Sequence, residues 1–150
     1  MIHLRCAMVA ASLLLLTACA GERPTNLGVR DGKLTQCPAS PNCVSSLAPQ
    51  DGHSIAPLSF SGDPATAFKQ LKLVLGRRPD TKLIEERGEY LRVEFRTSLG
   101  FVDDAEFLLD RGLRLIQLRS ASRLGYSDLG KNRSRMEEIR KQLAVALTPK

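Results

Sequence analysis

The chain has 150 residues and a formal net charge of +6 at pH 7, with 43% hydrophobic and 25% charged residues. These values are typical of one globular domain with a hydrophobic core. Tryptophan is absent and aromatic residues make up only 5%, which argues against an aromatic platform for stacking sugars or nucleic-acid bases.

The N-terminal residues are typical of a bacterial lipoprotein signal peptide. Arg5 precedes an apolar run over residues 7–16, which ends in Leu16-Thr17-Ala18-Cys19. The run is shorter than the roughly 20 apolar residues that cross a bilayer, and it has the length of a signal peptide's apolar region. We therefore predict that residues 1–18 are removed and that Cys19 is acylated. The alternative is an ordinary secretory signal, with Cys19 incidental.

A lipid on Cys19 predicts a protein of the cell envelope. Two or three acyl chains give stable anchoring where a single chain is marginal. Ala20 follows Cys19, and the absence of Asp there is typical of sorting to the outer membrane, facing the periplasm, in a Gram-negative cell. The expected partner is then the membrane itself, through the lipid anchor. Nucleic acid is not expected for an exported protein without a recognition motif.

Residues 19–33 are small, polar and glycine-containing, so they predict a flexible tether. A single domain is expected over residues 34–150. Near its start lie Cys37 and Cys43, which in an oxidising compartment predict one disulfide across a proline-rich loop. Free or redox-active thiols are an alternative. A metal site is another, although the Cys-x5-Cys spacing differs from the usual zinc pattern.

The domain is predicted to begin with a short edge strand over residues 53–60, interrupted by Pro57. A helix follows over residues 64–75, because Asp63 is a good N-cap and Pro64 suits the first helical position. Gly76 marks the end of this helix. One face of the helix carries apolar residues at helical spacing, and lysines lie off that face.

Four strands and a second helix are predicted next. Alternation of apolar and polar residues is clearest where Leu91, Val93 and Phe95 alternate with charged residues. The expected strands cover residues 81–86, 89–97, 104–109 and 113–120. The helix is expected over residues 132–147, with either a capping box of Ser134 and Glu137 or Asn132 as its cap.

The element order β-α-β-β-β-β-α predicts an α+β two-layer sandwich, in which a mainly antiparallel sheet carries both helices on one face. TATA-binding-protein-like and helix-grip folds have this arrangement, an analogy that carries no function. The other face of the sheet would show Arg92, Glu94, Arg96 and Glu106. An antiparallel sheet can leave such a face in water, so solvent exposure is expected there.

A candidate binding cluster is drawn from charged and polar residues in the second half of the chain: Asp103, Asp104, Arg119, Arg123, Tyr126, Asp128, Asn132 and Arg133. One hypothesis is an anion site, in which Arg119 and Arg123 act with the amino-terminal N–H groups of the second helix. The other is a structural network, in which the acids neutralise the arginines. The number of acids favours the structural network.

Catalytic patterns are weak. Asp103, Asp104 and Glu106 are the candidates for acid–base chemistry, and Asp104 and Glu106 would share a strand face. His53 is the one histidine beyond the signal segment, and a lone histidine is usually structural. No nucleotide-binding or nucleophile-elbow motif is present. We therefore assign no catalytic residue, no metal and no cofactor.

Three segments of this chain resemble the family catalogued as domain of unknown function 1499. They are residues 37–46 (CPASPNCVSS), residues 100–107 (GFVDDAEF) and residues 119–133 (RSASRLGYSDLGKNR). The resemblance extends over about residues 34–147. It implies a small bacterial protein of a kind that is often exported or lipid-anchored. It implies no activity, substrate or cofactor.

We expect these three motifs to meet at one edge of the sheet, around Asp103, Arg119, Arg123, Asp128 and Asn132. The expected function is that of a monomeric, lipid-anchored envelope protein that binds a partner or a small anionic ligand without catalysis. A small hydrolase-type enzyme using carboxylates is one alternative. A thiol redox protein using Cys37 and Cys43 is the other.

Overall fold

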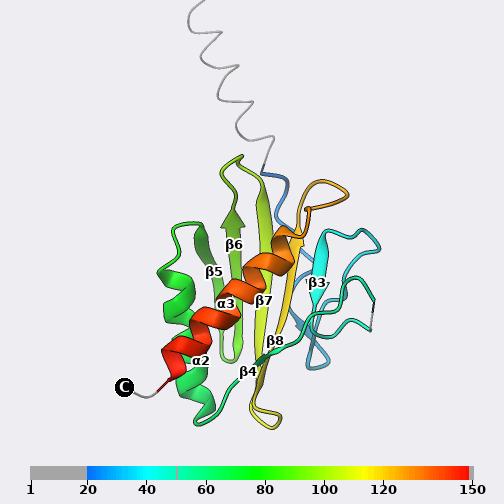
Figure 1. Ribbon diagram of the computed structural model, residues 1–150. Coiled ribbons are helices and arrows are strands. Elements are labelled where there is room, and N and C mark those ends of the chain that lie inside the picture. The colour runs from blue at the N-terminus through cyan, green and yellow to red at the C-terminus, as the bar shows by residue number, and fades with distance from the viewer. Residues whose placement is uncertain (1–19, 50, 149–150) are drawn as a thin grey trace, which may run out of the picture.

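The computed structural model describes residues 20–49 and 51–148 (Figure 1). The expected signal peptide and the expected lipid site at Cys19 lie outside the described residues. Among the helices of the described part, none has the length and apolar character needed to cross a membrane.

A six-stranded antiparallel sheet forms the body of the protein. Strands β5, β6, β7 and β8 follow one another as a meander, and the short strands β3 and β4 pair with different parts of β8. Their bounds are β3 Cys43–Ser45, β4 Leu58–Ser59, β5 Thr81–Arg87, β6 Tyr90–Arg96, β7 Val102–Asp110 and β8 Leu115–Ser122. The predicted α+β sandwich with a mainly antiparallel sheet is confirmed.

Both helices, α2 (Pro64–Gly76) and α3 (Lys131–Leu147), lie on one face of the sheet (Figure 1). Helix α2 begins as predicted, because the Asp63 carboxylate accepts a hydrogen bond of 2.8 Å from the backbone N–H of Thr66. A hydrogen bond from the Thr66 hydroxyl, together with this backbone bond, lowers the pKa of Asp63. Helix α2 ends at Gly76, as the sequence predicts.

The hydrophobic core fills the space between the helices and the sheet. The apolar positions of the alternating strands point into it, since successive side chains of a strand lie on opposite faces. Aliphatic residues and phenylalanines make up the core: Val44, Ile55, Leu58, Phe68, Leu71, Val74, Leu75, Leu91, Val93, Phe95, Ala105, Phe107, Leu109, Ile116, Leu118, Met136, Ile139 and Leu143.

The start of α3 differs from the prediction. Gly130 is the N-cap, with a φ of 77° that suits glycine, and the Asp128 carboxylate accepts hydrogen bonds from the N–H groups of Gly130 and Asn132. The expected capping box is wrong, because Ser134 and Glu137 lie inside the helix and Glu137 pairs with Arg140. Asn132 is also inside the helix.

The sheet face opposite the helices is covered, and the expected solvent exposure of Arg92, Glu94 and Glu106 is therefore wrong. Each of these three side chains is buried, whereas Arg96 is exposed. Residues 20–38 lie against this face and include a small hairpin of strands β1 (Val29–Arg30) and β2 (Lys33–Leu34). Residues 20–33, the described part of the predicted tether over residues 19–33, are thus packed on the sheet in the structure.

Three short strands were not predicted from the sequence: β1, β2 and β3. Each has only two or three residues, which is too short for a period-two pattern to stand out. The predicted strand over residues 53–60 is reduced to β4, with one isolated bridge between Ser45 and Ser54. Pro57, which lacks a backbone N–H, lies directly before β4.

Candidate functional site

The sheet divides the polar residues of β7, β8 and their neighbours into two clusters on its two faces. An outer-face cluster lies beneath residues 20–38 and consists of Arg92, Glu94, Asp104, Glu106, Arg119 and Arg123. A helix-face cluster lies beside the start of α3 and consists of Asn42, Asp103, Ser120, Ser122, Asp128, Asn132 and Arg135. Strand alternation explains the division, because adjacent residues such as Asp103 and Asp104 point to opposite faces.

The register of the strands brings opposite charges together in the outer-face cluster. Arg92 on β6, Glu106 on β7 and Arg119 on β8 are direct cross-strand partners and form one row. Glu94 is paired with Asp104 in the next row, and these two carboxylates would repel each other without a cation between them. The cation is Arg123, from the end of β8.

Arg123 holds the two carboxylates of this second row. Its Nε lies 2.6 Å from Asp104 Oδ2 and its Nη2 lies 3.0 Å from Asp104 Oδ1, a two-pronged pairing, and Nη2 also contacts Glu94. The hydrogen bonds to Asp104, with those to Glu94, raise the pKa of Arg123. Arg92 adds a 3.0 Å contact to Asp104 Oδ1.

Glu94 also receives a hydrogen bond from outside the sheet. Arg23 Nε donates to Glu94 Oε1 at 2.6 Å. Burial opposes ionisation of Glu94, but the hydrogen bonds from Arg23 and Arg123 outweigh it and lower the pKa of this carboxyl. Two arginines that are 100 residues apart in the sequence thus converge on one carboxylate.

Glu106 and Arg119 form the least complete pair of the outer-face cluster. Glu106 is fully buried, and its Oε1 accepts hydrogen bonds from the Tyr90 hydroxyl at 2.9 Å and from the backbone N–H of Gly28 at 2.7 Å. Its other oxygen, Oε2, has no hydrogen-bond partner and lies 3.6 Å from Arg119 Nη1, beyond ordinary hydrogen-bond distance. Burial raises the pKa of Glu106 and lowers the pKa of Arg119.

Arg119 borders a small pocket between the sheet and the N-terminal segment. The pocket has a volume of about 160 Å³. Its walls from β7, β8 and the residue after β8 are Asp104, Arg119, Ala121, Ser122 and Arg123, and the N-terminal part of the chain supplies the remaining walls: Glu22, Pro24, Asn26, Leu27 and Pro38. The Arg119 side chain is 7% exposed, and its Nε has no hydrogen-bond partner among the described residues. A buried cation therefore faces a space of a few water volumes.

Asn132 is the centre of the helix-face cluster. Its side chain is fully buried, and its Nδ2 lies 3.0 Å from Ser122 Oγ, 2.8 Å from Asp128 Oδ2 and 3.3 Å from the backbone oxygen of Asn42. Its Oδ1 accepts a hydrogen bond from Ser120. One side chain thus joins the cysteine loop, strand β8 and the loop that leads into α3.

Asp103 belongs to the same cluster, on the core side of the sheet. Ser122 donates a hydrogen bond of 2.5 Å to Asp103 Oδ1, and Arg135 Nη1 donates one of 2.8 Å to Asp103 Oδ2. The guanidinium of Arg135 also lies over the ring of Phe95, 4.6 Å from its centroid. Asp103 therefore fixes the first turns of α3 to the sheet.

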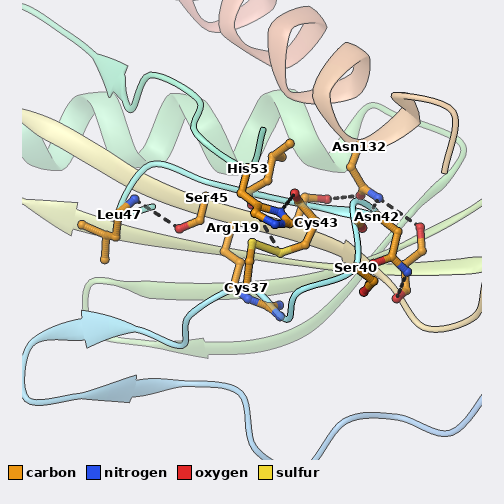
Figure 2. Close-up of a disulfide and its surroundings, with 12 residues drawn as sticks. Cys37, Ser40, Asn42, Cys43, Ser45, Leu47, His53, Arg119 and Asn132 are labelled. Atoms are coloured by element: carbon orange, nitrogen blue, oxygen red, sulfur yellow. Dashed lines mark hydrogen bonds between the residues drawn. A yellow bond between two sulfur atoms is a disulfide. The ribbon is translucent and has the colours of Figure 1, made fainter. Parts of the chain in front are cut away.

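The cysteine loop closes over the edge of the sheet. Cys37 and Cys43 form the predicted disulfide, with a Cα–Cα distance of 5.7 Å. Figure 2 shows this disulfide beside Arg119, with Asn42 next to Asn132 and the ring of His53 at the loop. His53 Nδ1 lies 3.0 Å from the backbone oxygen of Cys43, a structural contact. Asn42 Nδ2 donates to the backbone oxygen of Gly125 at 2.6 Å.

The structure brings some members of the predicted cluster together and separates others. Asp103, Asp128 and Asn132 lie together on the helix face, whereas Asp104, Arg119 and Arg123 lie together on the outer face. Tyr126 is 77% exposed and belongs to neither group. Arg133 is directed away from both and donates a hydrogen bond of 2.9 Å to the backbone oxygen of Gly52.

Several residues of these clusters were missed at the sequence level. Asn42, Ser120, Ser122 and Arg135 were not singled out, and Arg92 was noted only as an exposed position. Matching charges at alternate positions of β6, β7 and β8 were the available signal. That signal does not reveal burial, because the cover comes from residues 20–38, which lack periodicity.

Two larger grooves lie away from these clusters. One, of about 750 Å³, runs between the end of α2 and α3, and includes Arg78, Glu138 and Val145. The other, of about 370 Å³, lies between α2 and β5 and includes Leu73 and Leu83. Within residues 20–49 and 51–148, no three His, Cys, Asp or Glu side chains are placed to hold a metal ion.

Comparison with known proteins gives one match. A family model with the description "Protein of unknown function (DUF1499)" matches residues 33–143, which is most of the chain. No curated protein and no solved structure matches this chain.

Proposed function

The chain belongs to the family of proteins of unknown function DUF1499, and we propose that it is a lipid-anchored envelope protein that binds a small anion without catalysis. The anchor is proposed from the sequence up to Cys19, and the anion site is proposed from the geometry of the described residues. The ligand would carry a carboxylate or phosphate group. The binding site would be the pocket beside Arg119, and the anchor would be an acylated Cys19.

One observation carries the anion proposal: the incomplete pairing of the buried Arg119 guanidinium. A buried charge is costly unless it is paired and hydrogen-bonded, and this one has a bare Nε and a carboxylate only at 3.6 Å. An anion in the adjoining pocket would supply the missing acceptor. Arginine suits this task, since its planar donors match a carboxylate or phosphate.

The charges around the pocket limit which ligand fits. Asp104 also borders it, but its oxygens are engaged by Arg92 and Arg123. Glu22, an exposed residue at the pocket, opposes an anion. The pocket volume of about 160 Å³ matches a small ligand or the acidic head of a larger one.

Acid–base catalysis is the second candidate, because Glu106 has a raised pKa. Such a carboxyl is a common feature of active sites. Glu106 is, however, fully buried beneath Tyr90 and Gly28 and is not among the residues that border the pocket. A general acid must reach its substrate, so this placement favours binding.

Thiol redox chemistry is the third candidate. Cys43 is only 1% exposed and belongs to strand β3, which pairs with β8. Catalytic disulfides need an accessible sulfur and a nearby group that stabilises the thiolate. The position of Cys43 within the sheet favours a structural disulfide, although Cys37 is half-buried.

The anion proposal is tested with inorganic phosphate as the probe. Phosphate is expected to raise the thermal midpoint of the wild-type protein, with a stabilisation of about 2.7 kcal/mol at a hundred times the dissociation constant. Arg119→Met should abolish this effect. Because Arg119→Met leaves Glu106 without its cation, the double variant Arg119→Met/Glu106→Gln removes both charges and keeps the test valid if the single variant unfolds.

Arg133→Ala is the matched control, since Arg133 lies on the other side of the sheet and hydrogen-bonds only a loop oxygen. It should keep the full phosphate response. An equal response with and without Arg119 would contradict the proposal. The anchor is tested separately by palmitate labelling in cells, which Cys19→Ala should abolish.

A further inference from the structure

Two loops at one end of the sheet carry apolar side chains that face solvent. Leu99 and Phe101 lie between β6 and β7, and Leu124, Tyr126 and Leu129 lie between β8 and α3. Their exposed fractions are 76%, 42%, 42%, 77% and 96%. These five residues are called the apolar end surface. A hydrogen bond of 3.1 Å from Arg123 N to Val102 O joins the two loops at their bases.

Folding does not explain the residue at the tip of this surface. Leu129 has a φ of 53°, in the left-handed region that glycine and asparagine tolerate best, and its side chain is almost fully exposed. Leucine therefore costs backbone energy at this position and gains no packing within the domain. Strained, exposed positions of this kind are typical of functional surfaces.

The N-terminal segment leaves the domain at the same end. Gly21 packs against the second loop, so closely that a Cβ there would lie 3.0 Å from Arg123 Cβ and 3.1 Å from Leu124 Cγ. Figure 1 shows the blue start of the described chain at the end that carries both loops, while the β7–β8 turn lies at the opposite end. Cys19 is one peptide bond before Ala20, so a lipid on Cys19 holds this end next to the bilayer.

We infer that the apolar end surface is a membrane-contact surface, which inserts into the headgroup region of the bilayer and fixes the orientation of the domain; this rests on the proposed acylation of Cys19. Leucine and phenylalanine side chains suit the acyl boundary, and a tyrosine suits the interface with water. Arg96 and Lys131 are exposed at the bases of these loops and suit anionic headgroups. The acidic residues nearby include Glu22, Asp80 and Asp128.

The chain lacks tryptophan, so single tryptophan probes test this inference directly. Full-length Leu129→Trp and the control Leu113→Trp are purified from membranes and placed in vesicles of phosphatidylethanolamine and phosphatidylglycerol. Leu113 is 67% exposed in the β7–β8 turn at the far end. Brominated acyl chains should quench the emission of Leu129→Trp and leave that of Leu113→Trp unchanged.

A second pair of variants measures the strength of the contact. Leu99→Ser and Leu129→Ser each remove one exposed leucine and leave the core untouched. Each should weaken partitioning of the protein into the same vesicles by roughly tenfold, the effect of losing most of one leucine's burial. Leu113→Ser should have no such effect. Unchanged partitioning in both leucine variants would argue against the inference.

The outcomes separate the surface from the anchor. If palmitate is incorporated but neither probe is quenched, or both are quenched equally, the membrane-contact surface is wrong and the anchor stands. If palmitate is absent and brominated vesicles still quench Leu129→Trp, the anchor is wrong and the surface stands. Blue-shifted Leu129→Trp emission that bromine does not quench would indicate a protein cover and would overturn the inference.

Discussion

Replacing Asn132 by alanine should destabilise the domain more than any exposed substitution. The Asn132 amide has two N–H donors and one oxygen, so at most three strong hydrogen bonds form at once among its four partners. At about 1 kcal/mol net for each, their loss costs about 3 kcal/mol. The higher helix propensity of alanine offsets roughly 0.5 kcal/mol of this loss.

The loss of stability in Asn132→Ala is limited because most partners of Asn132 keep other hydrogen bonds. The backbone oxygen of Asn42 keeps a hydrogen bond from the N–H of Ser122, Asp128 keeps its backbone contacts, and Ser122 keeps Asp103. Only Ser120 loses its acceptor outright. The free energy of unfolding should therefore fall by about 2–3 kcal/mol rather than by the larger amount expected for several orphaned polar groups.

Urea unfolding at neutral pH measures this difference in the free energy of unfolding. The slope of that free energy against urea concentration should be the same in both proteins, which shows that unfolding exposes the same surface area in each. Arg133→Ala, one residue along the helix, is the control and should stay within about 0.5 kcal/mol of wild type. Asn132→Asp should be less stable than Asn132→Ala, because a carboxylate would face Asp128. If Asn132→Ala costs no more than Arg133→Ala, the amide does not join the three segments.

Three further predictions concern two buried carboxyl groups and the disulfide. Glu94→Gln should lower the free energy of unfolding by about 1–2 kcal/mol at pH 7. The difference from wild type should shrink as the pH falls below 4.5, because the pKa of Glu94 is lowered in the folded state and the stabilisation by its carboxylate is lost on protonation. The pKa of Glu106 is raised in the folded state, so ionisation of Glu106 lowers the stability of the wild type. Glu106→Gln should therefore gain stability relative to wild type as the pH rises above 4.5. If the free energy of unfolding in urea has the same pH dependence in the wild type and in both variants, both assignments are refuted. Cys37→Ala/Cys43→Ala should lower the free energy of unfolding by about 2 kcal/mol, because the disulfide closes a loop over six residues and so limits the entropy of the unfolded chain. A reductant should destabilise only the wild type. Equal melting temperatures of the two proteins in oxidising buffer would show that the crosslink does not stabilise the domain.

The regular elements could be predicted from the sequence because each has a strong local signal. Helix α2 has Asp63 and Pro64 at its start, and β6 alternates over its whole length, so both lie within a residue or two of their expected bounds. The disulfide followed from the two cysteines left after the expected signal segment and lipid site, in a protein expected to be exported. These features depend on neighbours along the chain, which a single sequence contains.

The arrangement of the polar residues depended on contacts that the sequence does not encode locally. Asp103 and Asp104 are adjacent, yet the first binds Arg135 on the helix face and the second binds Arg123 on the outer face. The alternation of β7 implied this division, but a single cluster was expected because the three motifs, which are distant in sequence, were predicted to meet at one edge of the sheet. The cover over Glu106 was missed because it is made by backbone groups, such as the N–H of Gly28, that any sequence would supply.

The covered outer face bears on why the charges are there. A buried ion pair rarely stabilises a fold more than apolar residues of the same size would, so stability alone does not account for three arginines and three acids under residues 20–38. Two other properties do. Arg23, the oxygen of Pro24 and the N–H of Gly28 each bond a charged side chain of the sheet, which positions the segment next to the expected anchor. Arg119, in the same cluster, keeps an Nε without a hydrogen-bond partner and borders the pocket beneath that segment, so the segment that these bonds hold on the sheet also supplies walls of the proposed anion site.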